Sequence, residues 1–63
     1  MQINMYDVVL LKNNIKGTII EIYEENKAYE IEILNDDNSK KYPSYSTKTI
    51  EYKDIARVIK RQV

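Results

Sequence analysis

Residues 17–34 read Gly-Thr-Ile-Ile-Glu-Ile-Tyr-Glu-Glu-Asn-Lys-Ala-Tyr-Glu-Ile-Glu-Ile-Leu, and this stretch decides the fold. Two runs in which apolar and polar side chains alternate flank a short polar break at residues 25–27. A period of two is typical of strands, because successive side chains point to opposite faces of a sheet. The stretch therefore predicts a β-hairpin with one buried and one solvated face.

The second arm of this hairpin sets the register. Tyr29, Ile31 and Ile33 share one face, and two glutamates occupy the other. A slip of one residue would bury both glutamates, so the register is strongly specified. In the first arm apolar residues occupy both faces, so the sequence does not decide whether Ile19 faces the core or the solvent. We expect a core that contains Ile20, Ile22, Tyr29, Ile31 and Ile33.

The flanking sequence predicts three further strands. Residues 6–12 are apolar on both faces, so a terminus, a loop or a partner is expected to cover the outer one, and Asn13-Asn14 marks the turn that follows. Gly17, the only glycine, is expected where the chain bends sharply or needs a backbone angle closed to other residues.

The C-terminal half is less regular. Residues 35–39 form a polar turn, and a fourth strand over residues 40–50 is interrupted by Pro43, which cannot donate to a ladder. A single helical turn is expected at residues 52–55 and a last strand at residues 56–60. Five short strands with one helical turn before the last predict an all-β, small five-stranded SH3-like barrel that forms a single domain over residues 1–63.

Four motifs carry a resemblance to a known family. They are Asp7-Val8-Val9-x-Leu11, Gly17-Thr18-Ile19-Ile20-Glu21, Tyr29-Glu30-Ile31-Glu32-Ile33 and Asp54-Ile55-x-Arg57-Val58. Together they resemble a family of short bacterial proteins known only as a domain of unknown function. The resemblance implies an SH3-like β-barrel and no established activity. The Gly17 strand is also similar to the KOW-type strand of ribosome- and transcription-associated barrels.

Composition excludes several classes of protein. The 63 residues include no Cys and no His, which rules out disulfides and zinc sites built from these ligands. The chain has no apolar run of the roughly 20 residues that span a bilayer, and it lacks a secretory signal. We expect a complete small cytoplasmic protein that needs no cofactor and no membrane.

The sequence offers little for catalysis. Nucleophilic and acid–base chemistry need positioned groups with tuned pKa values, and His and Cys are absent. The adjacent carboxylates at residues 24–25 and 36–37 lack the spacing of a calcium loop. A single glycine cannot form a glycine-rich phosphate loop. We expect neither an enzyme nor a metal site.

Charge is unevenly distributed although the net charge is zero. Residues 1–39 carry three basic and eight acidic side chains, whereas residues 40–63 carry seven basic and two acidic ones, which gives −5 and +5. Such asymmetry marks an interaction surface, or it reflects ion pairs between an acidic hairpin and basic strands of the same barrel.

The six tyrosines divide into two groups. Tyr6, Tyr23 and Tyr29 lie in or beside expected strands, where a ring packs in the core and its hydroxyl reaches the rim. The other three interleave with lysines, which suits either a plug for the open end of the barrel or contact with a partner. The expected partner is a protein, such as a toxin, a defence-system protein or a subunit of a complex. The candidate partner-binding residues are Tyr42, Tyr45, Tyr52, Lys40, Lys41 and Lys48.

Two other interactions stay open. A KOW-like barrel would bind nucleic acid, with phosphates contacted by Lys40, Lys41, Lys48, Arg57 and Arg61. A pI of about 6.2 argues against strong non-specific binding of this kind. A homo-oligomer held by the apolar outer face of residues 8–11 is the third hypothesis.

Overall fold

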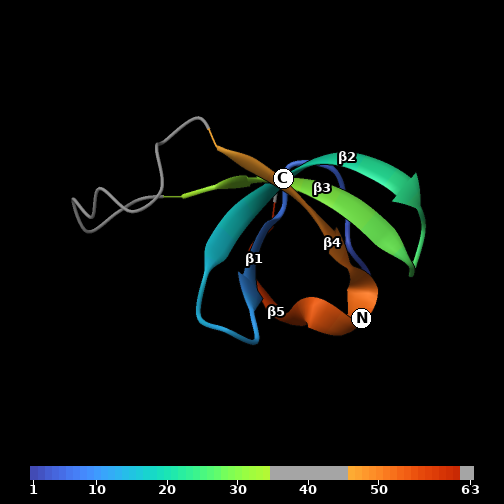
Figure 1. Ribbon diagram of the computed structural model, residues 1–63. Coiled ribbons are helices and arrows are strands. Elements are labelled where there is room, and N and C mark those ends of the chain that lie inside the picture. Colours follow the sequence, from blue (N-terminus) through green and yellow to red (C-terminus); the bar gives the residue numbers. More distant parts are fainter. Residues whose placement is uncertain (35–45, 62–63) are drawn as a thin grey trace.

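The computed structural model describes residues 1–34 and 46–61. Five antiparallel strands form one sheet in the order β4-β3-β2-β1-β5, with one 3₁₀ turn, η1, before the last strand (Figure 1). The elements are β1 (Val8–Leu11), β2 (Lys16–Glu24), β3 (Ala28–Ile33), β4 (Thr47–Glu51), η1 (Tyr52–Asp54) and β5 (Ile55–Lys60). This confirms the all-β, SH3-like prediction. The sheet is not closed, because the edge strands β4 and β5 do not pair with each other.

Asparagine lies in the turns that join β1 to β2 and β2 to β3. Asn14, after β1, and Asn26, between β2 and β3, have φ values of 70° and 63°. Asn tolerates this left-handed region because its short polar side chain bonds to nearby backbone. Both turns lie where the sequence predicts them, so the hairpins need no glycine there. The expected turn at residues 35–39, and the part of the fourth strand around Pro43, lie outside the described residues.

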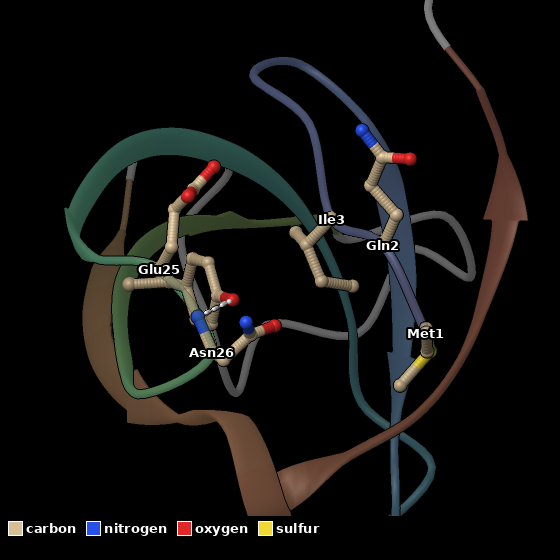
Figure 2. Close-up of a pocket in the computed structure, with 6 residues that line it drawn as sticks. Met1, Gln2, Ile3, Glu25 and Asn26 are labelled. Carbon is tan, nitrogen blue, oxygen red and sulfur yellow. Dashed lines mark hydrogen bonds between the residues drawn. The ribbon is translucent and has the colours of Figure 1, made fainter.

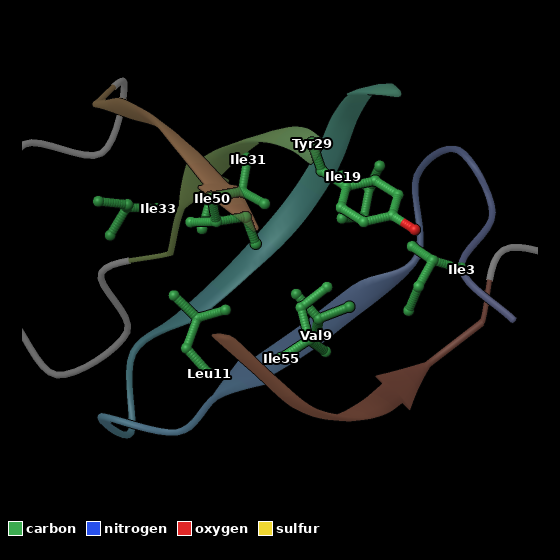
Figure 3. Packing of buried hydrophobic residues seen from close by; sticks show 9 residues of the cluster. All are labelled: Ile3, Val9, Leu11, Ile19, Tyr29, Ile31, Ile33, Ile50 and Ile55. Carbon is green, nitrogen blue, oxygen red and sulfur yellow. The ribbon is translucent and has the colours of Figure 1, made fainter. Parts of the chain in front are cut away.

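The core lies inside the curved sheet and is built mainly from isoleucine (Figure 3). On β3, Tyr29, Ile31 and Ile33 are buried, while the two glutamates point outward, as the alternation predicts. The buried apolar residues are Ile3, Val9, Leu11, Ile19, Tyr29, Ile31, Ile33, Ile50 and Ile55. Every described strand contributes to this cluster, so the sheet and the core form together.

The prediction that Ile20 on β2 lies in the core is wrong. Ile19, whose face the sequence left open, is fully buried, whereas Ile20 is only half-buried and lies outside the core cluster. A β-bulge is the cause: Ile19 pairs with Ile31 but Glu21 pairs with Glu30, so one residue of β2 is extra. The bulge returns Ile22 to the inner side, where it is half-buried and packs against the core.

The expectation for Gly17 also needs correction. Its φ is not positive, so no special backbone angle requires glycine at this position. The reason is space: a Cβ on Gly17 would lie 2.6 Å from Ile31 Cδ1 and 3.2 Å from the carbonyl oxygen of Glu32. Gly17 is buried in β2 because β3 packs directly over it.

The N-terminal segment closes one end of the core. Ile3 inserts among the buried residues, and the Tyr52 hydroxyl donates to the Met1 carbonyl oxygen at 3.0 Å. Asp7 is fully buried, and its Oδ2 accepts from the Asn4 amide at 2.9 Å and from Arg61 Nη1 at 3.1 Å. These contacts tie the first seven residues to η1 and to the end of β5.

Candidate functional site

Half of the expected site residues can be located. Lys48, Tyr52, Arg57 and Arg61 are described, and the other four lie outside the described residues: Lys40, Lys41, Tyr42 and Tyr45. The structure therefore bears on a lysine near the start of β4, on the tyrosine that follows β4, and on two arginines in and just after β5.

Lys48 lies at the open edge of the sheet. It pairs in register with Ile31, whose side chain is in the core, so Lys48 faces the same inner side at the rim. There it lines a hollow of about 210 Å³, which we call the seam hollow. The lining residues are Leu11, Lys12, Asn13, Lys48, Ile50 and Asp54.

The seam hollow lies where the end of β1 and the turn after it approach β4 and η1. Leu11 and Ile50 are buried core residues, so the hollow has an apolar base. Lys12 and Lys48 are exposed cations at its sides, and Asp54 contributes one carboxylate. The volume is below the roughly 300–1,000 Å³ of pockets for small ligands. It suits one or two side chains of a bound polypeptide.

Tyr52 is not part of the seam hollow. Its ring is half-buried against the core, and its hydroxyl is engaged with Met1. It therefore holds the N-terminal segment in place. This is closer to the first of the two roles considered for these tyrosines, a plug for the end of the barrel, than to contact with a partner. The structure does not bring Lys48 and Tyr52 into one hollow.

The two arginines have different surroundings. Arg61 makes an ion pair with buried Asp7 and also donates to the Gln2 carbonyl oxygen at 2.9 Å, so it contributes to the fold. Arg57 is exposed on β5 opposite Leu10. The sequence did not indicate the role of Arg61, because Asp7 is 54 residues away along the chain.

A second hollow of about 450 Å³ lies beside the N-terminal segment and the β2–β3 turn (Figure 2). Glu25 is the only carboxylate that lines it, and no basic side chain does. The Tyr29 hydroxyl accepts from the Asn26 amide at 2.9 Å, which holds the turn. The lining residues are Met1, Gln2, Ile3, Glu25, Asn26 and Tyr29. They provide no nucleophile paired with a base.

A polar cluster lies on the outer face of the hairpin, where "outer face" means the side of the sheet away from the core. Glu30 Oε1 accepts from the Thr49 hydroxyl at 2.6 Å and from the Tyr23 hydroxyl at 3.3 Å. The bond from Thr49 holds the pKa of Glu30 below its ordinary value, against an opposing effect of desolvation. Desolvation, followed by the charge of Glu30, raises the pKa of Tyr23.

Among the ion pairs within the described chain, the one between Arg61 and Asp7 connects the acidic half of the sequence to the basic half. The ion pairs join Lys27 to Glu24 at 3.8 Å, Lys53 to Glu51 at 3.3 Å and Arg61 to Asp7 at 3.1 Å. The first two are short-range surface pairs, and the third anchors the terminus. None links the outer glutamates of β2 and β3 to Arg57 or Lys60 on β5.

No group of three potential metal-binding side chains occurs within residues 1–34 and 46–61. In the same residues, no helix has the length and apolar character to cross a membrane. Comparison with protein-family models, with curated proteins and with solved structures finds no match for this chain.

Proposed function

We propose that this chain is a non-enzymatic, cytoplasmic protein-binding module that accepts a segment of its partner at the seam hollow. One observation carries the proposal: an apolar base formed by Leu11 and Ile50 lies open between two exposed lysines. Apolar anchors surrounded by polar side chains are typical of interface hot spots. The absence of His and Cys supports a role outside catalysis.

The lysines define the kind of segment that fits. An apolar side chain of the partner fills the hollow, and acidic residues beside it meet Lys12 and Lys48. Opposite charges across an interface speed association and fix the register of binding. The partner class stays as the sequence suggests: a toxin, a defence-system protein or a subunit of a complex.

Affinity capture from the lysate of the native host tests this function. The bait is the tagged chain, the lysate is treated with nuclease, and bound proteins are identified by mass spectrometry. We expect one protein to be captured by the wild type and lost with Lys12→Glu/Lys48→Glu. The matched control, Lys27→Glu/Lys53→Glu, reverses two exposed charges that do not line the hollow and should retain the partner. Capture that is equal with both variants would place the binding site elsewhere.

Nucleic acid is the second candidate, and Arg57 and Lys60 on one strand favour it. Affinity capture from a lysate that has not been treated with nuclease tests nucleic-acid binding directly. Binding that disappears after nuclease, and that falls steeply with added salt, would replace the protein-binding proposal, because phosphate contacts release counterions.

A further inference from the structure

The outer face of the sheet has an apolar centre. Directly opposed residues of neighbouring strands face the same side, and Val8 pairs with Thr18 while Leu10 pairs with Lys16. Val8 and Leu10 are half-buried on this side, and the bulge in β2 adds half-buried Ile20. These three side chains give the outer face of β1 and β2 an apolar strip, and exposed Lys16 lies at its end beside Leu10.

One flank of this strip is basic. On β5, Arg57 pairs with Leu10 and Lys60 pairs with Val8, so both cations lie on the outer face. Both are exposed, and no ion pair engages either of them within the described residues. Half-buried Ile59 precedes Lys60 at a register shift of the ladder between β1 and β5.

The other flank is acidic. Glu21 on β2 lies directly opposite Glu30 on β3, and Glu32 follows on the same face. Like charges in such positions repel each other. The remaining cross-strand neighbours of these glutamates are threonines, Thr18, Thr47 and Thr49, so none of their directly opposed partners is a cation.

The two flanks are too far apart to neutralise each other. Strand β3, with Glu30 and Glu32, is three strand spacings or about 14 Å from β5 along the sheet, and β2, with Glu21, is two spacings or about 10 Å from it. Exposed charges are largely screened beyond the Debye length of about 8 Å at physiological salt. The outer face therefore carries a positive flank and a negative flank on either side of an apolar centre.

We propose that this face binds a second copy of the same chain in a two-fold symmetric dimer. A two-fold axis through the apolar strip places the basic β5 flank of each copy over the acidic β3 flank of the other. Such an interface is self-complementary and closed, so it gives a dimer rather than a filament. The proposal goes beyond the protein-binding function and uses a different surface from the seam hollow.

The pattern of charge selects this occupant. An acidic peptide or a nucleic acid would meet Glu21, Glu30 and Glu32, and a basic partner would meet Arg57 and Lys60. Only a partner with both signs in the reverse order satisfies the whole face, and a rotated second copy provides that order. A standard interface takes about 800 Å² per partner, which is under a fifth of the 4516 Å² that the chain exposes.

Analytical ultracentrifugation of two charge-reversal variants tests the dimer. Arg57→Glu/Lys60→Glu makes both flanks acidic, and Glu21→Lys/Glu32→Lys makes both flanks basic. Glu30 is left intact because it accepts hydrogen bonds from Thr49 and Tyr23. We expect the wild type to dimerise between about 10 μM and 1 mM, and each variant alone to bind itself at least about tenfold more weakly.

An equimolar mixture of the two variants should restore association, because a face with two acidic flanks then meets a face on which basic side chains predominate. Circular dichroism establishes that each variant is folded. The control Lys27→Glu/Lys53→Glu and the seam variant Lys12→Glu/Lys48→Glu should dimerise like the wild type, which separates this proposal from the binding function. A wild type that stays monomeric throughout the range, or a mixture that fails to associate, would overturn the dimer.

Discussion

Replacement of Gly17 by alanine tests how tightly β2 and β3 pack. The new Cβ would lie 2.6 Å from Ile31 Cδ1, 3.1 Å from Ile31 Cβ and 3.2 Å from the backbone oxygen of Glu32. Ile31 is fully buried at the centre of the core, so its side chain has little room to move. Overpacking of this kind costs about 1–3 kcal/mol, and the lower entropy of alanine in the unfolded chain offsets about 0.5–1 kcal/mol.

The net loss is therefore about 1–2 kcal/mol. In a domain of this size it corresponds to a fall in Tm of about 5–15 °C. A second substitution identifies the contact responsible. Ile31→Val removes Cδ1, the atom nearest to the new methyl group, and costs about 0.5–1.5 kcal/mol by itself. The double variant should be more stable than the sum of the two single effects by about 1 kcal/mol.

Urea unfolding followed by circular dichroism measures the four stabilities of this double-mutant cycle. Ile55→Val provides the matched control, since Ile55 is a buried isoleucine that is not among the nearest neighbours of the new Cβ. Gly17→Ala combined with Ile55→Val should be additive. If Gly17→Ala costs nothing, or if both pairs prove equally additive, the close approach of Ile31 to β2 is not what requires glycine.

Three further predictions follow from named contacts. Arg61→Met removes an ion-pair partner from the fully buried carboxylate of Asp7, and because Arg61 is half exposed we expect a loss of about 1–2 kcal/mol in urea unfolding; an unchanged midpoint would contradict the ion pair. Thr49→Val removes the bond that lowers the pKa of Glu30, so the Glu30 carboxyl should titrate at higher pH by NMR. The pKa of Glu30 is lower in the folded protein than in the unfolded one. The bond from Thr49 therefore stabilises the fold at pH values above the unfolded pKa, and this stabilisation is lost as the pH falls through the folded pKa. The variant lacks this contribution, so it should lose less stability on acidification. Tyr6 has a φ of 68°, which is unfavourable for a bulky side chain, and its ring is 55% exposed; Tyr6→Asn should therefore melt no lower than the wild type, and a clear fall in Tm would show that the ring stabilises the fold.

The sequence predicts the architecture because β3 alternates without ambiguity. One face of that strand is wholly apolar and the other carries two glutamates, so only one register is acceptable. The turns follow from asparagines that tolerate left-handed angles. Strong local signals and the overall fold agree there, which is why the succession of strands along the chain and the 3₁₀ turn could be anticipated from so short a chain.

The charged surface could be predicted only in part. The opposite net charges of the two halves are visible in the sequence, and ion pairs inside the barrel were one interpretation of them. The described ion pairs do not join the outer glutamates to β5, since two strands separate β5 from β3 and one strand separates it from β2. Strand order is a tertiary property, so the flanks of the outer face become evident only once β1 and β5 are known to pair.

The buried carboxylate illustrates a different limit. Asp7 lies within an apolar run that reads as the first strand, and nothing local indicates that it is enclosed. Its burial depends on Arg61 and on the turn that brings the Asn4 amide to its side chain. Contacts between the two ends of a chain carry no periodic signal, so sequence patterns alone do not reveal them.

The facing of β2 gives the sharpest comparison between sequence and structure. A bulge adds one residue, and a run with isoleucine at three of four positions does not show where it falls. Ile19→Thr and Ile20→Thr form a matched pair, because threonine is also β-branched and suits a strand equally well at both sites. Ile19 is fully buried, so its replacement places a hydroxyl in the core and removes packed methyl groups, at a cost of about 2–4 kcal/mol.

Ile20 is half-buried on the outer face, and its replacement should cost less than about 1 kcal/mol. A domain of this size has a stability of roughly 0.05–0.15 kcal/mol per residue, so Ile19→Thr should be largely unfolded or close to it while Ile20→Thr retains a cooperative transition. Urea unfolding of the two variants side by side decides whether Ile19 or Ile20 lies in the core. The reverse order of stability would place Ile20 in the core and remove the bulge from β2, and the apolar strip proposed to join two copies would lose its β2 member.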